Sequence, residues 1–279
     1  MFIKKLTVAF ILLPPFLWIW WRGGFFFLTL FTLFSVIAAD EIIMMATNKN
    51  APYWLRIVIT GLTLLVSVSI ERANWAAVLG LSNEWFKYAP NTIYLFVLFV
   101  LMCMHVFSFG LISQAGPRLF ASFFAVFYAV LPISSLVELR MDSRYGLGFT
   151  FLCLSMTWLC DSFAYIGGKQ FGKTKIAPLL SPNKSLEGLV FGMCASALAS
   201  LLSAFIFGLP YHWSYLFLLG LLAGLFGQIG DLAESLIKRS FGVKDSGSLI
   251  PGHGGVLDRF DAVLFVAPLV VLFVNYCPR

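Results

Sequence analysis

Residues 92–112, TIYLFVLFVLMCMHVFSFGLI, contain no Asp, Glu, Lys or Arg. About 20 predominantly apolar residues suffice for a helix to cross the hydrocarbon core of a bilayer. Runs of similar character recur, and the candidate spans are residues 6–21, 24–40, 56–71, 92–112, 119–137, 146–168, 187–207, 213–230 and 260–277. The pattern predicts an all-α integral membrane protein, a bundle of about nine transmembrane helices.

The composition of the whole chain supports this fold class. Of its 279 residues, 60% are hydrophobic and 11% are charged, and the mean hydropathy is +0.90. These values lie far outside the range of soluble globular domains. Because a polytopic bundle shares one lipid-facing core, we expect residues 1–279 to form a single membrane domain. The five cysteines lie in or beside apolar runs without a spacing that suits zinc, so we interpret them as packing residues.

The distribution of basic residues predicts the orientation of the spans. With nine spans and a cytoplasmic N-terminus, 13 of the 19 Lys and Arg residues fall on the cytoplasmic side and six on the other. Cytoplasmic loops carry an excess of Lys and Arg, which supports this orientation. The loops at residues 169–186 and 231–259 are separated by two spans, so they face the same side. They can therefore form one polar, cytoplasm-facing site.

Charged residues concentrate just before the last apolar run. Residues 231–261 hold nine of the chain's 32 charged side chains. Asp231, Ser235 and Lys238 have the spacing i, i+4 and i+7, which places a carboxylate, a hydroxyl and an ammonium on one helical face. Each charge alone could be a solvated loop residue near lipid headgroups. As a group, they indicate a site.

A glycine turn separates this group from two further aspartates. Residues 251–255, PGHGG, disfavour a helix and let backbone amides approach a bound anion. Asp258 and Asp261 follow at i and i+3, so we expect them on one face. An aspartate inside the hydrocarbon costs about 2.5–3.5 kcal/mol, so acids this close to an apolar run need cationic partners or a wet cavity. Magnesium binds one or two carboxylates together with substrate phosphates, which indicates a nucleotide or pyrophosphate site.

The loop at residues 169–186 has a complementary composition. Asp161 is an acid within an apolar span, and such residues are candidate functional residues by default. Lysines follow it, which either form part of the site or obey the positive-inside rule. These lysines are Lys169, Lys173, Lys175 and Lys184. Ser181-Pro182 is typical of a helix start, with serine as the cap and proline in the first turn.

Two other features concern packing. Gly188, Gly192 and Ser196, and likewise Gly220 and Gly224, have the small-xxx-small spacing that lets helices approach closely, either within the chain or in a dimer. A further pair of acids, Asp40 and Glu41, stands at the end of a span. We expect this pair at the membrane interface.

The run SLIKRSFGVKDSGSLIPGHGGVLDRFD, residues 235–261, resembles the signature of the phosphatidate cytidylyltransferases, also called CDP-diacylglycerol synthases. The resemblance extends upstream through Asp161 and the segment SPNKS, and it covers about residues 160–262. Where the family pattern has a threonine, this chain has Ser185, which keeps the hydroxyl. The matching positions of the signature are Ser235, Lys238, Arg239, Lys244, Asp245, His253, Gly254, Gly255, Asp258, Arg259 and Asp261.

The resemblance implies a reaction in which CTP and phosphatidic acid give CDP-diacylglycerol and pyrophosphate. Under this hypothesis Asp231, Asp258 and Asp261 hold Mg²⁺, with one or two cations in the site. Ser235 binds a phosphate oxygen or a cation, and His253 orders the glycine turn. The cationic residues expected to bind nucleotide, lipid phosphate or pyrophosphate are Lys238, Arg239, Lys244, Arg259, Lys169, Lys173 and Lys184. Asp161 is expected to lie in the same substrate-binding site.

Other functions remain alternatives. A CTP-dependent kinase of polyprenol or phytol would share the nucleotide chemistry but would need a general base for its alcohol, with His253 as the candidate. An ion-coupled transporter would scatter its acids over several spans, whereas here they cluster at one end. The sequence outside the predicted spans has no basic stripe interleaved with aromatic residues, so it does not indicate nucleic-acid binding. The resemblance is compatible with a homodimer that contacts membrane lipid. The small portion of the chain outside the predicted spans suggests a location in a bacterial inner membrane.

Overall fold

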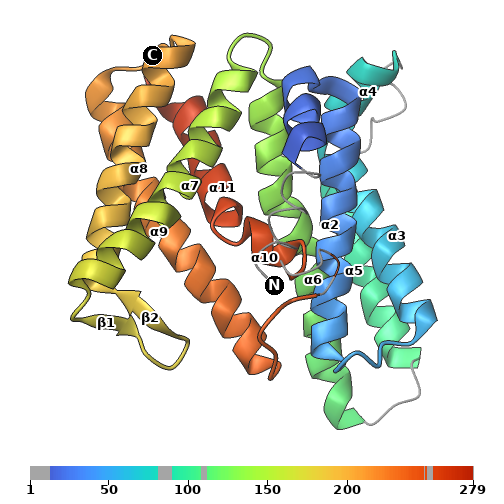
Figure 1. Cartoon of the computed structure of the whole chain (residues 1–279). Coiled ribbons are helices and arrows are strands. Elements are labelled where there is room, and N and C mark those ends of the chain that lie inside the picture. The colour runs from blue at the N-terminus through green and yellow to red at the C-terminus, as the bar shows by residue number, and fades with distance from the viewer. Residues whose placement is uncertain (1–12, 81–89, 108–111, 248, 250–253, 279) are drawn as a thin grey trace. The chain divides into compact units, whose positions relative to one another are not determined.

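The computed structural model describes residues 13–80, 90–107, 112–247, 249 and 254–278 (Figure 1). The chain divides into two compact units. One unit comprises residues Met1–Val137 and Asp245–Arg259, and the other comprises Glu138–Lys244 and Phe260–Arg279. The expected single membrane domain stays a prediction.

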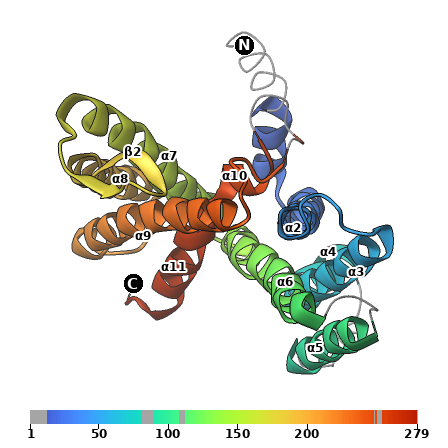
Figure 2. The same cartoon turned by 90° about the horizontal axis from the view of Figure 1, so that it is seen from below.

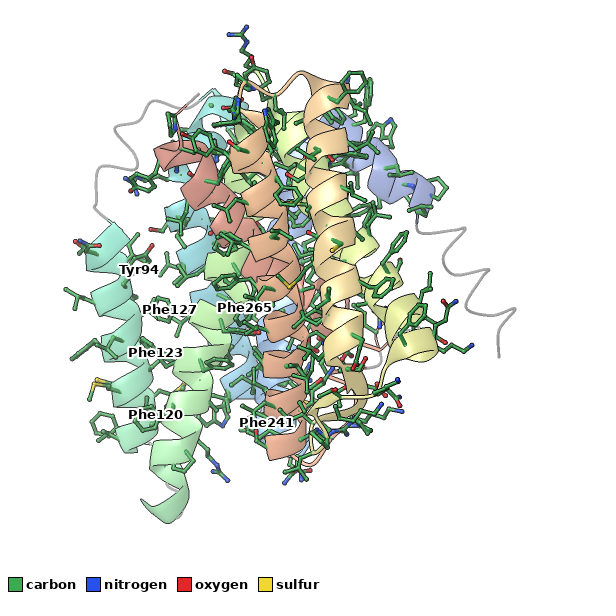
Figure 3. The ribbon with its side chains drawn as sticks, turned by 90° about the vertical axis from the view of Figure 1, so that its left-hand side faces the viewer. Tyr94, Phe120, Phe123, Phe127, Phe241 and Phe265 are labelled. Carbon is green, nitrogen blue, oxygen red and sulfur yellow. The ribbon has the colours of Figure 1, made fainter. Side chains whose placement is uncertain are left out.

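Helices joined by short connections make up the described part of the first unit. Its helices are α2 (Gly24–Ala46), α3 (Tyr53–Ile70), α4 (Arg72–Leu79), α5 (Pro90–Phe107), most of α6 (Ile112–Met141) and the short α10 (Leu257–Phe260). Aromatic side chains fill the contact between α5 and α6, where the ring centroids of Tyr94 and Phe127 are 5.7 Å apart (Figure 3). Apolar packing of this kind brings α5 and α6 together in the first unit.

The second unit contains four helices and a hairpin. The helices are α7 (Gly146–Phe171), α8 (Leu186–Phe207), α9 (Trp213–Ser240) and α11 (Val263–Tyr276). The antiparallel strands β1 (Lys175–Ala177) and β2 (Ser181–Ser185) connect α7 to α8. Figure 2 shows this hairpin at the ends of α7 and α8.

Small residues let these helices approach closely. A methyl group on Gly188 would lie 2.7 Å from the carbonyl oxygen of Ala164 on α7, and one on Gly224 would lie 2.7 Å from Cα of Met193 on α8. At Gly230, a methyl would lie 2.8 Å from the ring of Phe265 on α11 (Figure 3). The predicted close helix packing is therefore confirmed, and these glycine faces are used within the chain.

The predicted spans correspond well to the observed helices. Six helices of the described residues are long and apolar enough to cross a membrane, namely α2, α3, α6, α7, α8 and α9. The shorter apolar helices α5 and α11 coincide with two further predicted runs. Of the first predicted span, residues 6–21, residues 6–12 lie outside the described residues and residues 13–21 are helical. The helical character is confirmed, and the count of nine spans remains a prediction.

Two local predictions are wrong. Ser181-Pro182 does not begin a helix but lies in β2, and α8 begins at Leu186 with Ser185 as its cap, whose Oγ accepts a hydrogen bond from Gly188 N at 3.2 Å. Pairing with β1 holds residues 181–185 extended, which the local sequence does not reveal, and adds a hairpin to the predicted all-α fold.

The second error concerns Asp258 and Asp261. These two aspartates do not share one helical face, because α10 ends at Phe260 and α11 begins at Val263. Asp258 lies in α10 and Asp261 in the turn that follows it, and they are assigned to different compact units.

Candidate active site

One face of α9 carries the predicted Asp231, Ser235 and Lys238. The helix continues well beyond the predicted apolar span, as far as Ser240, so the expected helical spacing is confirmed. Asp231 Oδ1 lies 3.5 Å from Ser235 Oγ. The Lys238 ammonium lies 3.0 Å from Oε1 of the fully buried Glu234 side chain, one turn earlier. Glu234 thus offsets much of the charge that Lys238 was expected to offer to substrate.

A second lysine reaches Asp231 from the hairpin. Lys184 on β2 places its Nζ 2.7 Å from Asp231 Oδ2 and donates to the backbone oxygen of Gln228 at 3.3 Å. Its side chain is only 16% exposed. The predicted pairing between the lysine-rich loop and the acidic segment is therefore present at Lys184.

Gln228 connects Asp161 to the same region. Its side-chain amide donates to Asp161 Oδ1 at 2.9 Å and so joins α7 to α9. Gln228 was not predicted as a site residue, although a buried polar side chain in the apolar run GLFGQIGD is a usable signal. Asp161 is correspondingly held next to the carboxylate-bearing face of α9.

Asp261 completes the group from the turn between α10 and α11. Burial raises the pKa of Asp261 to about 7, and the neighbouring carboxylates of Asp231 and Asp161 contribute to the rise. The glycine at position 230 permits this approach, because a methyl there would lie 2.7 Å from the backbone oxygen of Asp261. We call Asp161, Asp231, Asp261 and Lys184 the acid cluster.

The chemistry of the acid cluster suits a divalent cation that the substrate helps to bind. Asp161 and Asp261 both lie near Asp231, which pairs with Lys184, so the three carboxylates of the cluster outnumber its one lysine, and the pKa of Asp261 is raised by burial first and by these carboxylates second. Among the described residues, no three His, Cys, Asp or Glu side chains form a ready-made metal site. Magnesium needs only one or two carboxylates when substrate phosphates supply other ligands. The donor set therefore fits Mg²⁺ bound together with a phosphorylated substrate.

The other predicted cations of the second unit are exposed. Lys169 ends α7, and Lys173 lies in the turn before β1. The backbone amides of Lys173 and Thr174 donate to the Glu187 carboxylate at 3.0 and 3.1 Å, which fixes this turn against α8. Arg239 donates to the backbone oxygen of Val243 at 3.2 Å. The side chains of these three cations are exposed.

The first unit contains Asp258 and Arg259 of the predicted signature. Asp258 Oδ2 accepts hydrogen bonds from the backbone amides of Ser246 and Gly255, both at 2.9 Å, and lies 3.0 Å from Ser246 Oγ. The side chains of Lys244, in the second unit, and Arg259 are exposed. His253 lies outside the described residues.

Glu41 of α2 is a residue that sequence reasoning missed. Its carboxylate accepts hydrogen bonds from the backbone amides of Val256 at 2.8 Å and Leu257 at 3.0 Å, and from Ser246 Oγ at 2.9 Å. Glu41 is buried inside the protein, and its expected location at the depth of the membrane interface stays a prediction. The only local sign of this role was an acid near the end of a span. The partners of Glu41 lie more than 200 positions later in the sequence.

Long apolar helices place the chain in the class of helical membrane proteins. Residues 3–277 match the Cytidylyltransferase family, so the chain belongs to that family. The resemblance expected from residues 160–262 is confirmed over nearly the whole chain.

Curated relatives carry a common name, phosphatidate cytidylyltransferase. The relative from Staphylococcus aureus is 33% identical over 273 residues, 96% of each chain. The relative from Staphylococcus epidermidis is 34% identical over 274 residues, again 96% of each chain. The relative from Bacillus subtilis is 42% identical over 146 residues, which is 52% of this chain and 54% of the relative.

Proposed function

We propose that the chain transfers the CMP moiety of CTP to phosphatidic acid at the acid cluster, giving CDP-diacylglycerol and pyrophosphate. The cytidylyltransferase family and the curated relatives support this enzyme activity. The observation that carries the assignment to this part of the chain is the grouping of Asp161 and Asp261 near Asp231, which pairs with Lys184. Carboxylates in excess over cations suit a site that works on metal-bound phosphates.

The reaction requires little acid–base chemistry from the protein. An oxygen of the lipid phosphate attacks the α-phosphorus of CTP, the bond from that phosphorus to the bridging oxygen breaks, and pyrophosphate leaves with the bond's electron pair. A phosphate monoester has a second pKa of about 6, so the nucleophile is already largely anionic at neutral pH. The protein must chiefly neutralise repelling phosphates and align them.

The acids of the site would hold one or two Mg²⁺ ions. Asp231 and Asp261 would bind the cation in the second unit, and the sequence assigns the same role to Asp258. When bound, the cation would neutralise phosphate charge and orient the reacting phosphates. Asp161 and its partner Gln228 would keep the α7 side of the acid cluster in position.

The cations and the hydroxyl would act on the phosphate groups themselves. Lys184 would neutralise a phosphate next to Asp231, and Ser235 would donate a hydrogen bond to a phosphate oxygen. Lys238 would act through its pair with Glu234, and His253 would order the glycine turn. The exposed cations proposed to attract CTP and the lipid headgroup are Lys169, Lys173, Arg239, Lys244 and Arg259.

The cellular setting is part of the same proposal. A nine-span topology with a cytoplasmic N-terminus places the loops at 169–186 and 231–259 on the cytoplasmic side, where CTP is available. The bacterial relatives are consistent with an integral protein of a bacterial inner membrane. A single membrane domain and a homodimer belong to this proposal too.

The test is product formation by detergent-solubilised protein given CTP and phosphatidic acid, with and without Mg²⁺. We expect equal amounts of pyrophosphate and CDP-diacylglycerol, and only when both phosphatidic acid and Mg²⁺ are present. Parallel reactions contain phytol or a polyprenol in place of the lipid acid. CDP formed with the alcohol would instead indicate a kinase, and the absence of turnover with any acceptor would favour a transporter.

A further inference from the structure

Glu41 binds a loop that lies far from it in sequence. The side chain projects from α2, is only 7% exposed, and uses both carboxylate oxygens. Oε1 accepts from Val256 N, and Oε2 accepts from Leu257 N and Ser246 Oγ. Figure 1 shows the corresponding approach of α2 and α10 within the first unit. Burying a carboxylate is costly unless its oxygens are paired, so these hydrogen bonds are a condition for this packing.

The loop is shaped around this carboxylate. A methyl group on Gly247 would lie 2.7 Å from Glu41 Oε1. A methyl group on Gly255 would overlap both Glu41 Oε1 and Ser246 Oγ. Neither glycine could gain a side chain without displacing Glu41 or the loop, so the glycines of the signature serve this contact.

Ser246 connects Glu41 to Asp258. Its hydroxyl oxygen lies 2.9 Å from Glu41 Oε2 and 3.0 Å from Asp258 Oδ2. The backbone amides of Ser246 and Gly255 also donate to Asp258, so the peptide that contacts Glu41 also orients Asp258. We call Glu41, Ser246 and Asp258 the loop clamp. A shift of Glu41 would therefore move the aspartate of the signature.

The supporting helix is itself anchored beside the loop clamp. Asp40, the preceding residue, accepts two hydrogen bonds from the Arg56 guanidinium of α3, both at 2.7 Å. Bidentate pairs of this kind add geometric specificity as well as energy. Glu41 thus projects from a helix end that α3 holds in place.

We propose that Glu41 is a positioning residue for cytidylyl transfer. It fixes the position of Ser246, Val256 and Leu257 and, through Ser246, orients the carboxylate of Asp258. This inference rests on the proposed function, because it assigns Asp258 to the reaction. Glu41 acts through the loop rather than by touching substrate. A displacement of about 1 Å at a reacting group costs about 100-fold in rate, so a positioning residue can have a large kinetic effect.

The decisive variant is Glu41→Gln, which keeps the size of the side chain but in either orientation turns an NH₂ group toward a backbone N–H donor, of Val256 or of Leu257. We expect kcat to fall about 10- to 100-fold and the Mg²⁺ concentration for half-maximal rate to rise, with KM for CTP changed less than about twofold. Glu138→Gln is the matched control, since this exposed carboxylate bonds only to Asn275 among the described contacts, at 3.3 Å. It should retain wild-type kinetics.

Ser246→Ala tests the connection to Asp258 separately. It removes the bridging hydroxyl but leaves the Val256 and Leu257 amides on Glu41. We expect a smaller loss of kcat in the same direction, with the same rise in Mg²⁺ requirement. The double variant should lose less than the product of the two single effects, because both act through one contact. If Glu41→Gln does not fold, Ser246→Ala decides the proposal by its Mg²⁺ dependence.

Hydrogen exchange separates this inference from the proposed reaction. The amides of Val256 and Leu257 should exchange faster in Glu41→Gln than in wild type, whatever reaction the protein catalyses. If these amides exchange faster in Glu41→Gln but the wild-type protein shows no cytidylyl transfer, the proposed function is refuted and Glu41 is a structural residue only. Wild-type kcat and Mg²⁺ dependence in folded Glu41→Gln would overturn the positioning role itself.

Discussion

The acid cluster and the loop clamp use the same side-chain chemistry in opposite ways. In the acid cluster, Asp231 and Asp161 pair with the side chains of Lys184 and Gln228. Asp261 accepts one hydrogen bond, from Ala262 N at 2.7 Å, and lies near the like charges of Asp231 and Asp161. In the loop clamp, backbone amides donate to Glu41 and Asp258. The comparison teaches that the partners of a carboxylate, rather than its residue type, separate a candidate cation site from a structural support.

The physical basis is charge balance. Backbone N–H groups stabilise a carboxylate with dipoles and fix a local chain conformation. Neighbouring carboxylates do the reverse, and together with burial they raise the pKa of Asp261 to about 7. A group with excess negative charge is stabilised by binding a cation, whereas a carboxylate surrounded by amides is already satisfied.

The largest expected effect breaks the acid cluster. Asp231→Asn removes the charge paired with Lys184 and should reduce CDP-diacylglycerol formation about 100- to 1,000-fold at saturating Mg²⁺. The matched control is Asp142→Asn, because Asp142 accepts hydrogen bonds from the backbone amides of Arg144 and Tyr145 at 2.9 and 2.6 Å. It should remain within about twofold of wild type. Near-normal turnover of Asp231→Asn would remove Asp231 from the metal site.

A smaller effect is expected at the lysine of the acid cluster. Lys184→Met should lower kcat/KM for CTP about 10- to 100-fold, since it removes the one cation that reaches Asp231 from β2. Lys184→Arg should recover part of the loss. Lys175→Met provides the control in the same hairpin, where the side chain is exposed. Equal losses for the two methionine variants would show that the hairpin acts through its net charge alone.

The pair formed by Glu234 and Lys238 tests whether a buried ion pair serves the reaction or only supports the fold. Lys238→Met leaves a fully buried carboxylate without its 3.0 Å partner and should lower the thermal midpoint. The double variant Glu234→Gln/Lys238→Met should regain most of that stability, with activity reduced less than about tenfold. A stable but inactive double variant would assign Lys238 to phosphate binding.

The smallest effect is expected from the packing of α8 against α9, the helices that support the acid cluster. Gly224→Ala introduces a methyl that would lie 2.7 Å from Cα of Met193, so α8 and α9 must separate slightly. We expect a loss of about 1–3 kcal/mol in the free energy of unfolding, measured by thermal denaturation in detergent. Gly61→Ala on α3 is the control, because nothing lies within 4 Å of its added methyl. Equal stability of the two variants would argue against close packing around the acid cluster.

Much of the fold could be predicted because membrane helices are local. The runs at residues 146–168 and 187–207 became α7 and α8 with nearly the predicted limits. The helical spacing of Asp231, Ser235 and Lys238 was also correct. The hairpin was missed because its extended conformation depends on the pairing of Lys175 with Ser185 and of Ala177 with Ser181.

The candidate site was predictable in its components but not in its pairings. The acids and lysines stand out in a chain with so few charges, yet nothing local distinguishes Lys184, which reaches Asp231, from Lys173, which stays exposed. The role of Glu41 was hidden for the same reason, since Ser246 follows it by 205 positions.

The sequence by itself determined the membrane-helical class and the cytidylyltransferase family. A backbone in lipid must satisfy its own hydrogen bonds, so an apolar run of sufficient length specifies a helix without reference to the rest of the chain. Only the tertiary structure decided that Lys184 meets Asp231 and that Glu41 meets the signature loop. Those pairings depend on close helix approach at small residues and on the burial of charges that require partners, which are properties of the folded chain.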